Sequence, residues 1–593
     1  METWPNLIEM FFAQAEKLAD RPFLWAKENG NYVSQSWGEV ADNVLAISKG
    51  LKSLGIEKGD RVVLCSENRP EWPIAHLAIM AAGAITVPVY TTNTVNDHLY
   101  ILTNSGAKAA IVSTNNLADR MIPAAHQTDS ISFVITIEEL DINQISGLDI
   151  KTWHSMVSTG NAMEGGIKDA VYTPTKDDTA VIIYTSGTGG APKGVMLPHR
   201  AILHNCRGAA DVLKGLGIEN NVFLSFLPLS HSYEYTAGQF FPISIGAQIY
   251  YAEGIEHLAS NMAEARPTLM TAVPRLYESM HSRIMRGVEK SGGIKATLFA
   301  TAVRLGQKKI TNPGGLSIGE KISDVIVDKL VRNKVRANFG GRLKALVSGG
   351  APLNPDIGNF FSALGLRLLQ GYGQTESAPV ISCNRPDGIK LDTVGQPLLD
   401  TEVKIAEDDE ILVKGELVMT GYWRNEEATR EALRDGWLHT GDVGHIDEQG
   451  RILITDRKKD IIVNSGGDNI SPQRVEGFLT LEPEIAQALV HGDKRPHLVG
   501  LLVPDADFAN DWAAANNADN DLVALIKNDA FIKAIDEAVD RVNANLGVIE
   551  RVRRFILTAD AFTVDNEQMT PTLKVRRHIV TDIYGERLED LYR

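Results

Sequence analysis

Residues 184–194 carry the strongest signal in this chain and read Tyr184-Thr185-Ser186-Gly187-Thr188-Gly189-Gly190-Ala191-Pro192-Lys193-Gly194. They follow the apolar run 180–183, which predicts a buried strand. Glycine allows successive backbone N–H groups to face outward and form a concave anion site, and the hydroxyl groups and the lysine add further donors. The stretch therefore predicts a strand that ends in a polyphosphate-binding loop.

This loop differs from the P-loop of many nucleotide-binding proteins. Pro192 stands where that pattern has its second glycine, and Gly194 follows the lysine where Ser or Thr would contact magnesium. A plain Gly- and Ser-rich turn after a strand is the alternative interpretation. A run of this length and composition favours the phosphate site.

The bulk composition limits the classes of function. The chain has 593 residues, of which 44% are hydrophobic and 23% charged, and its net charge is -16. This length predicts several domains or subdomains rather than one core. The acidic balance argues against non-specific binding of nucleic acid, so anionic substrates must be held by local nests and local Lys or Arg.

The cysteines and the N-terminal sequence predict a cytoplasmic location. Cys65, Cys206 and Cys383 show no C-x-x-C spacing, so we expect neither a zinc site nor a disulfide framework. The N-terminus lacks the basic region of a secretory signal, and no apolar run of about 18 residues predicts a membrane span. Residues 7–12 are expected to open a helix that packs in the core, with membrane contact as the less favoured alternative.

Strand-like and helical segments alternate along the chain. Residues 61–65 and 84–89 are expected strands, and residues 72–82 between them are an expected helix. This alternation is typical of parallel sheets covered by helices, so the predicted fold class is α/β. We expect a large N-terminal domain of several subdomains with parallel-type sheets packed by helices, followed by a small, mobile α+β domain.

A charged link, Asp456-Arg457-Lys458-Lys459-Asp460, marks the expected domain boundary. We predict a first domain over residues 1–456, a hinge at 457–460 and a second domain over 461–593. A link that only crosses the surface is the alternative. In the second domain, residues 497–503 predict a strand, and residues 531–546 predict a helix with one apolar face.

The composition changes between residues 282 and 338, where the sequence becomes basic and helical. A solvated helical face is the expected reading of such a charge run. Contact with the phosphates of coenzyme A, or with an anionic membrane surface, is the alternative.

A second motif, residues 368–376, places an apolar strand before Gly371-Tyr372-Gly373-Gln374-Thr375-Glu376. Tyr372 offers a face for a flat ring to stack on, and Thr375 can donate to a phosphate oxygen. Glu376 is a hard oxygen ligand of the kind that magnesium prefers beside phosphates and water, and we expect it to act with Thr185. A strand and turn with an exposed acid is the alternative.

Together these motifs resemble the signature segments of the AMP-forming adenylate synthetases, a superfamily that includes acyl-CoA synthetases, luciferases and the adenylation domains of peptide synthetases. Four further segments match that family in the expected order, at residues 226–234, 347–353, 435–442 and 570–574. Within the superfamily, the residue sequences of several segments and the length of the chain are most similar to those of bacterial long-chain fatty-acid–CoA ligases. The chain departs from the family at Gly189, where Thr is usual.

The resemblance implies a set of nucleotide-binding residues. They are Thr185, Ser186, Gly187, Thr188, Gly189, Gly190, Lys193, Gly349, Gly350, Ala351, Gln370, Gly371, Tyr372, Gly373, Thr375, Asp442, Arg457, Lys459, Gly466, Gly467 and Lys574. In this reading the 349–351 turn lies beside the adenine. A carboxylate at the end of a Gly turn can accept both hydroxyls of a ribose, and the resemblance implies this role for Asp442, with Arg457 also contacting the ribose.

The same resemblance implies the catalytic and metal-binding roles. Lys574 would bridge the substrate carboxylate and the α-phosphate, and Glu376 and Thr185 would hold Mg²⁺. Thr188 and His231 complete the implied catalytic set, with a structural histidine as the alternative for His231. ATP, Mg²⁺ and coenzyme A are therefore the expected cofactor and co-substrates, with the acyl pocket and the ATP site in residues 1–456.

The expected reaction is ATP-dependent activation of a long-chain fatty acid to acyl-AMP and pyrophosphate, followed by transfer to coenzyme A. The resemblance implies that residues 461–593 act as a lid, which rotates about Lys459 to exchange Lys574 for the 465–469 face. Alternatives are a medium-chain or aryl acid, loading of a carrier protein, and a non-catalytic nucleotide or lipid sensor. Homodimer formation and peripheral association with the inner membrane face stay open.

Overall fold

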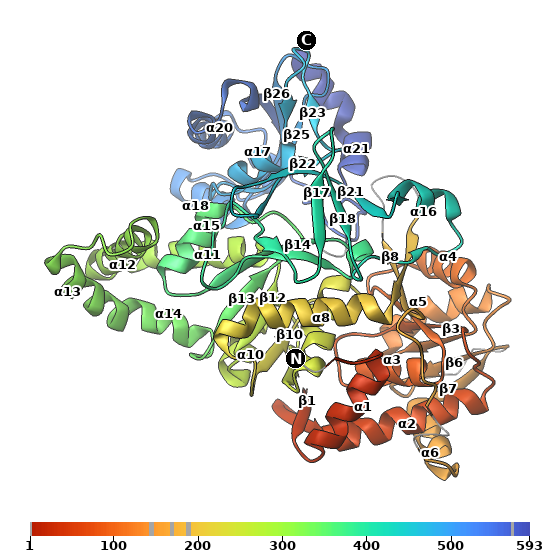
Figure 1. Ribbon diagram of the computed structural model, residues 1–593. Helices are drawn as coiled ribbons and strands as arrows, with labels where there is room; N and C mark the ends of the chain where they lie inside the picture. The colour runs from red at the N-terminus through yellow and green to blue at the C-terminus, as the bar shows by residue number, and fades with distance from the viewer. Residues whose placement is uncertain (1–2, 141–146, 167–170, 186–190, 571–573) are drawn as a thin grey trace.

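The computed structural model describes residues 3–140, 147–166, 171–185, 191–570 and 574–593 (Figure 1). The N-terminal two-thirds of the chain forms two large sheets with helices packed around them, in the lower part of the view. The C-terminal residues form a smaller unit above them. The predicted α/β class with a smaller C-terminal domain is confirmed.

The first large sheet has the strand order β19-β9-β8-β4-β3-β5-β6-β7. Strands β8, β4, β3, β5, β6 and β7 are parallel, whereas β9 and β19 join one edge in antiparallel fashion. The bounds are β3 Arg61–Cys65, β4 Ile85–Val89, β5 Ala109–Val112, β6 Phe133–Thr136, β7 Asp149–Thr152, β8 Thr179–Thr185, β9 Lys193–Pro198 and β19 Gly421–Tyr422. Strand β5 is buried throughout, as expected for a parallel strand covered on both faces.

The second large sheet has the order β16-β15-β14-β13-β12-β10-β11-β1-β2. Its centre is parallel, and antiparallel strands close both edges. The bounds are β1 Pro22–Glu28, β2 Asn31–Ser36, β10 Val222–Ser225, β11 Gln248–Tyr251, β12 Leu269–Ala272, β13 Ala345–Ser348, β14 Leu368–Gly373, β15 Val380–Cys383 and β16 Gln396–Pro397.

Helices join the two sheets through one apolar core. Helix α1 (Leu7–Leu18) buries Leu7, Ile8 and Phe11 in that core, which confirms the prediction of core packing. The other helices of this part are α2 Trp37–Ser53, α3 Glu71–Ala81, α4 Val95–Ser105, α5 Asn115–His126, α6 Trp153–Ala162, α8 His199–Leu213, α9 Phe241–Ser244, α10 Leu258–Ala265 and α15 Pro355–Ala363, with the short turns η1 Lys214–Leu216 and η2 Glu234–Phe240.

A third, antiparallel sheet departs from the expectation of parallel-type sheets throughout this part of the chain. It has the order β17-β18-β21-β20, and β22 pairs with β21. The bounds are β17 Glu402–Ile405, β18 Glu410–Lys414, β20 Leu433–Arg434, β21 Trp437–Ile446 and β22 Ile452–Arg457, with α16 Glu426–Ala432 before β20. Burial alternates along β21, and the pairs β17–β18, β20–β21 and β21–β22 are each joined by a short turn, which antiparallel pairing allows.

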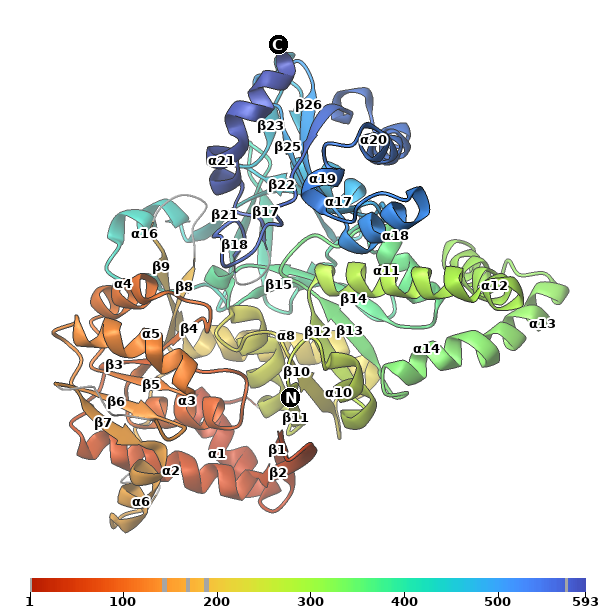
Figure 2. The ribbon, with the colours of Figure 1, turned by 180° about the vertical axis from the view of Figure 1, so that it is seen from behind.

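A helical arm leaves the second large sheet and projects from the body in both ribbon views (Figures 1 and 2). It consists of α11 Pro274–Ser291, α12 Gly293–Thr311, α13 Ile318–Val327, η3 Asp328–Arg332 and α14 Asn333–Asn338. This confirms that the basic segment 282–338 is helical.

Beyond residue 461 the apolar side chains form clusters of their own, built on the sheet β25-β26-β27. The strands are β23 Ile462–Val463, β24 Asn469–Ile470, β25 Ile485–His491, β26 Leu498–Pro504 and β27 Val552–Leu557. The helices are α17 Pro472–Leu479, α18 Ala506–Asn516, α19 Leu522–Leu525, α20 Asp529–Ala544 and α21 Arg577–Glu589, with the single turns η5 Val548–Glu550 and η6 Asp590–Tyr592.

The three cysteines are free and buried. In the part of the chain that the structure describes, no helix is long and apolar enough to cross a membrane.

The contact between α2 and α6 gives a stability prediction. A Cβ atom at Gly160 of α6 would lie 1.9 Å from the Ala46 carbonyl oxygen of α2, so the two helices can approach only with glycine here. We expect Gly160→Ala to lower the free energy of unfolding by about 1–3 kcal/mol, measured by urea denaturation.

Gly287 of α11 is the matched control for that substitution. A Cβ atom there would meet no heavy atom within 4 Å. Gly287→Ala should therefore stabilise the protein, by about 0.5–1 kcal/mol, because it only restricts the unfolded chain. Equal effects of the two substitutions would contradict the close helix contact.

Candidate active site

The predicted site residues are brought together where the three sheets of the N-terminal part meet. Strand β8 ends at Thr185, β13 ends at Ser348 and β14 ends at Gly373. Parallel strands place their carboxyl ends at one edge of a sheet, and ligands of open α/β sheets bind outside that edge. The antiparallel sheet adds Asp442 from β21 and Arg457 from β22 to the same place.

Both oxygens of the Asp442 carboxylate accept hydrogen bonds from other side chains of the site. The Tyr372 hydroxyl donates to its Oδ2 at 2.6 Å, and Arg457 Nε donates to its Oδ1 at 3.0 Å. The Asp442 charge raises the pKa of the Arg457 guanidinium, and burial together with that charge raises the pKa of Tyr372 well above its usual value. Asp442 and Arg457 thus form an ion pair, called the anchor below, next to the Tyr372 ring, whose hydroxyl is held by Asp442.

One local expectation about these residues is corrected. Asp442 does not end a glycine turn but lies inside strand β21, where its partner across the ladder is Arg457. Tyr372 is buried at 8% exposure, and its strand continues through Gly373. Gly373 allows this course because a Cβ atom there would lie 1.7 Å from the Pro379 carbonyl oxygen.

Glu376 lies in the single turn η4 (Thr375–Ser377) that follows β14. The Tyr422 hydroxyl of β19 donates to its Oε1 at 2.8 Å, and burial together with the Glu376 charge raises the pKa of Tyr422. The Lys193 ammonium lies 5.1 Å from the centre of the Tyr422 ring, in cation–π range. Tyr422 thereby contacts both Lys193, at the end of the glycine-rich segment, and Glu376.

The residues present fit a magnesium ion held mainly by phosphate oxygens. The described residues contain no group of three or more His, Cys, Asp or Glu side chains assembled as a metal site. Mg²⁺ commonly keeps one or two carboxylates and takes its other ligands from phosphates and water. Glu376 has one oxygen held by Tyr422, and its Oε2 makes no hydrogen bond within the described part of the chain.

The 349–351 turn is positioned by an aromatic contact. The Tyr233 hydroxyl donates to the Val347 carbonyl at 2.8 Å, and its ring lies against Gly349, where a Cβ atom would be 2.9 Å from the ring. Gly350 has φ +83°, a backbone conformation that favours glycine. Both glycines are therefore required by the geometry of this turn.

Several buried polar atoms around the ends of β13 and β14 have no hydrogen-bond partner among the described residues. They are Ser348 Oγ, Gln370 Oε1 and Gln374 Nε2. An unpaired buried polar group is costly, so such atoms point to a site that is completed by a polar ligand. The predicted binding residue Gln370 belongs to this group.

His231 and Thr375 are linked to the segment 228–234. Thr375 Oγ1 shares a hydrogen bond of 3.0 Å with Ser232 Oγ, and the backbone N–H of Tyr233 donates to His231 Nδ1 at 3.3 Å. Burial and the Lys574 charge lower the pKa of His231 to about 3, so its imidazole is neutral at physiological pH.

Lys574 reaches this site from the C-terminal part of the chain. Loss of hydration and the charge of Arg457 lower its pKa to about 8, while Asp442 and Glu376 act in the opposite direction. The residue keeps a solvent-exposed surface, yet its ammonium group is close enough for the charges of the site to act on it. Lys574 therefore lies within electrostatic range of Glu376 in η4, Asp442 in β21 and Arg457 in β22.

The C-terminal part is held in this position by few polar contacts. Arg275 at the start of α11 donates to the Ala486 carbonyl at 2.8 Å, and Arg286 forms ion pairs with Asp505, at 3.6 Å, and with Asp507. These contacts lie largely at the surface, where ion pairs contribute little to stability.

The remaining predicted residues are placed as follows. Residues 186–190, which include Ser186, Gly187, Thr188, Gly189 and Gly190, lie outside the described residues. Ala351 is exposed beside Gly350. Gly371 approaches the Ser382 carbonyl, where a Cβ atom would be 3.3 Å away. Lys459, Gly466 and Gly467 lie in exposed turns, and no hydrogen bond or ion pair of the described residues links them to Asp442 or Glu376.

Three contacts around the site were not predicted from the sequence. Tyr422 holds Glu376, Ser232 holds Thr375, and Arg275 holds the C-terminal part. Each partner is far away in the sequence, and none of the three residues belongs to a motif with a mechanism of its own. Ser232 lies within segment 226–234, which the sequence analysis identified, but its hydrogen bond to Thr375 could not be predicted from that segment.

Two family models match the chain. The model of the AMP-binding enzyme family matches residues 11–423, and the model of the AMP-binding enzyme C-terminal domain matches residues 459–593. Together they span most of the chain.

The chain belongs to the AMP-binding enzyme family.

Among the curated relatives of this AMP-binding enzyme, the long-chain-fatty-acid–CoA ligase FadD15 of Mycobacterium bovis is 33% identical, with 99% of this chain and 97% of the relative aligned. The peroxisomal long chain acyl-CoA synthetase 6 of Arabidopsis thaliana is 30% identical over 95% of this chain and 82% of its own. The long-chain-fatty-acid–CoA ligase 6 of Mus musculus is 29% identical over 97% and 83%.

Solved structures share the fold of the AMP-binding enzyme. The adenylation domain of a carboxylate reductase from Mycobacterium chelonae superposes with a TM-score of 0.79 at 22% identity, covering 100% of this chain and 92% of that one. An anthranilate CoA ligase in complex with anthranoyl-AMP gives a TM-score of 0.74 at 19% identity, with 99% and 98% covered.

A buried acid beside the site gives a pH prediction. Glu234 is fully buried, accepts a 2.6 Å hydrogen bond from Thr271 Oγ1, and leaves its Oε1 unpaired among the described residues. Burial raises its pKa from 4.5 to about 7. The folded state therefore keeps a proton that the unfolded state loses, and this contribution to stability disappears as the pH rises from 4.5 to about 7.

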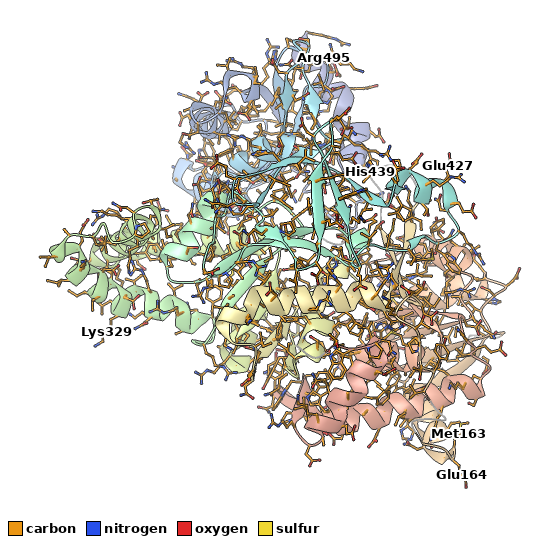
Figure 3. All side chains as sticks on the ribbon, viewed as in Figure 1. Met163, Glu164, Lys329, Glu427, His439 and Arg495 are labelled. Atoms are coloured by element: carbon orange, nitrogen blue, oxygen red, sulfur yellow. The ribbon has the colours of Figure 1, made fainter. Side chains whose placement is uncertain are left out.

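We expect Glu234→Gln to remove this dependence. The free energy of unfolding of the variant, measured by urea denaturation, should rise relative to that of the wild type between about pH 5 and pH 7. The rise should be at most about 1.4 kcal/mol per pH unit. Glu427→Gln, on the exposed surface of α16 (Figure 3), is the control and should show a constant difference. A constant difference for Glu234→Gln as well would mean that Glu234 ionises like an exposed acid.

Proposed function

We propose that this AMP-binding enzyme activates a long-chain fatty acid with ATP, forming acyl-AMP and pyrophosphate, and then transfers the acyl group to coenzyme A. The first half-reaction is supported by Lys574, which lies within electrostatic range of Arg457, Asp442 and Glu376. The long-chain substrate and the coenzyme A acceptor are supported by relatives of that name aligned over nearly the full chain.

The adenylation step needs positive charge where the carboxylate meets the α-phosphate. A carboxylate is a poor electrophile, because its leaving group would be oxide, and adenylation supplies a better one. The substrate carboxylate attacks the α-phosphorus, and pyrophosphate leaves on the opposite side. In our proposal the Lys574 ammonium bridges the two anions, and Lys193 and the segment 185–190 contact the outer phosphates.

The nucleoside would be held by the anchor described above. Asp442 would accept the ribose hydroxyls, with Arg457 fixing the orientation of its carboxylate. Tyr372 and the 349–351 turn would border the adenine, and the unpaired Gln370 Oε1 is a suitable acceptor for a base N–H. Glu376 and Thr185 would hold Mg²⁺, which supplies charge neutralisation at the phosphates when it is bound.

His231 is suited to a neutral role in this scheme. Its lowered pKa keeps the imidazole uncharged beside Lys574, so it orients the substrate carboxylate by hydrogen bonding and leaves the positive charge to the lysine.

The second half-reaction needs room for a thiol where Lys574 lies. We propose that residues 461–593 form the lid, that 457–460 is the hinge, and that rotation about Lys459 withdraws Lys574 and presents the Gly466–Gly467 turn. Gly467 has φ +88°, and a Cβ atom there would meet nothing within 4 Å, so the turn is open to a thin pantetheine chain. The few polar contacts made by Arg275 and Arg286 are the ones that such a rotation breaks.

The reaction type is tested by its products. The purified protein with Mg-ATP and a panel of acids from acetate to oleate, including aryl acids, should release pyrophosphate and AMP, fastest with long-chain acids. Formation of ADP would refute the proposed chemistry. Product formation with a carrier protein but not with coenzyme A would replace the proposed acceptor.

Lys574→Ala separates the two half-reactions. Loss of the bridging charge should slow acyl-AMP formation by roughly a hundredfold or more, while thioester formation from supplied acyl-AMP stays near the wild-type rate. Arg576→Ala is the control, because that side chain donates to the Glu567 carbonyl instead. An equal loss in both half-reactions would contradict the alternating roles of the lid.

Lys459→Pro tests the hinge. Proline fixes φ and restricts the preceding residue, so the turn at 458–460 loses freedom to rotate. We expect thioester formation to slow by about tenfold or more relative to adenylation. Lys459→Ala keeps the backbone free and should resemble the wild type. A greater loss of adenylation in the proline variant would contradict the hinge.

A further inference from the structure

The outer face of the helical arm carries an unusual row of exposed apolar side chains. Ile318, Ile322 and Val325 of α13 are 80%, 60% and 70% exposed, and Ile326 and Leu330 follow at 49% and 45%. Spacings of four and three residues place the first three on one side of the helix. The opposite side of α13 packs inward through Val327 against Ala302 and Leu305 of α12.

The acidic side chains of the same helices are paired with basic side chains of the arm. Glu320 pairs with Lys308 at 2.8 Å. Asp324 pairs with Arg332, and Asp328 with Arg336, each at 2.8 Å. The negative charges of α13 and η3 are therefore compensated within the arm.

The lysines around the apolar row have no such partners. Lys321, Lys329 and Lys334 are exposed and make no ion pair or side-chain hydrogen bond within the described ranges. Figure 3 shows Lys329 at the outer edge of the arm, pointing away from the body. Residues 282–338 as a whole hold twelve Lys and Arg against four Asp and Glu, in a chain whose net charge is -16.

We propose that the face of α13 and η3 formed by Ile318, Ile322, Val325, Lys321 and Lys329 docks on an anionic lipid bilayer. An interfacial helix inserts its apolar side chains into the boundary between headgroups and acyl chains, and its lysines meet lipid phosphates.

Charge complementarity selects this occupant over a second copy of the chain. In a symmetric contact through this face the unpaired lysines of one copy would meet those of the other. Like charges brought together in this way disfavour the contact. An anionic bilayer satisfies both the apolar row and the lysines.

Docking would also bring the enzyme to the phase that holds its substrate. Long-chain fatty acids partition into bilayers, so an arm that binds lipid places the body next to them. This consequence rests on the proposed function, whereas the docking itself does not.

The test uses the full-length protein and sedimentation with vesicles. Vesicles of phosphatidylcholine alone are compared with vesicles that also contain phosphatidylglycerol. The first variant is Ile318→Gln/Ile322→Gln/Val325→Gln, which keeps good helix formers in place. The second variant, Lys321→Glu/Lys329→Glu/Lys334→Glu, reverses the charge.

Matched controls carry the same changes elsewhere on the surface. Ile255→Gln/Val523→Gln/Val548→Gln replaces apolar residues that are 59%, 51% and 66% exposed. Lys17→Glu/Lys527→Glu/Lys533→Glu reverses three exposed lysines outside the arm. Thermal unfolding of every variant verifies that the fold is kept.

We expect the wild type and both controls to bind the phosphatidylglycerol vesicles, with binding that weakens as salt is added. Each arm variant should bind at least about tenfold more weakly. Equal binding to both kinds of vesicle, an equal loss in the controls, or no vesicle binding by the wild type would overturn the proposal. A wild-type dimer that the arm variants convert to monomers would overturn it in favour of a contact between copies.

The vesicle assay needs no turnover, so it is independent of the ligase proposal. Lipid binding by a protein that forms no AMP with any acid would refute the proposed function and leave the docking face in place.

Discussion

The Asp442 carboxylate is the point on which the site depends. It lies in β21 of the antiparallel sheet, and its two oxygens are taken by Tyr372 from the second large sheet and by Arg457 from β22. A buried carboxylate is stable only when it is paired and hydrogen-bonded. Arg457 supplies the charge from within the same sheet, and the Tyr372 hydrogen bond ties the antiparallel sheet to β14. The same carboxylate would bind the ribose, which makes the proposed ligand contact and the packing of the sheets parts of one arrangement.

Hydrophobic pattern and local chemistry predicted much of the fold. The apolar run 180–183 is within β8, and the expected strand 61–65 is β3. The expected helix 531–546 is observed as Asp529–Ala544, two residues earlier at each end. Its early start has a clear cause, because the Asn528 side chain accepts hydrogen bonds from the N–H groups of Ala530 and Phe531 and caps the helix there. Such end effects depend on a single capping hydrogen bond, which periodicity does not reveal.

The contacts that complete the site could not be predicted in this way. Tyr372 and Asp442 are 70 positions apart, and Tyr422 and Glu376 are 46 apart, so only the folded topology brings them together. The antiparallel sheet was not predicted because its central pair, β18 and β21, is separated by residues 415–436 and meets only in the folded chain. Lys574 was identified through family resemblance, since a single lysine carries no local signal of its own.

The uneven distribution of charge has one more consequence. The arm is basic, and the rest of this acidic chain is therefore more negative than the net charge of -16 suggests. A basic arm that projects from an otherwise acidic body gives the molecule an electric dipole. A charged surface exerts a torque on such a body before any contact forms, so the molecule approaches in a preferred orientation. Added salt shortens the range of that torque, which ties the rate of oriented encounter to ionic strength.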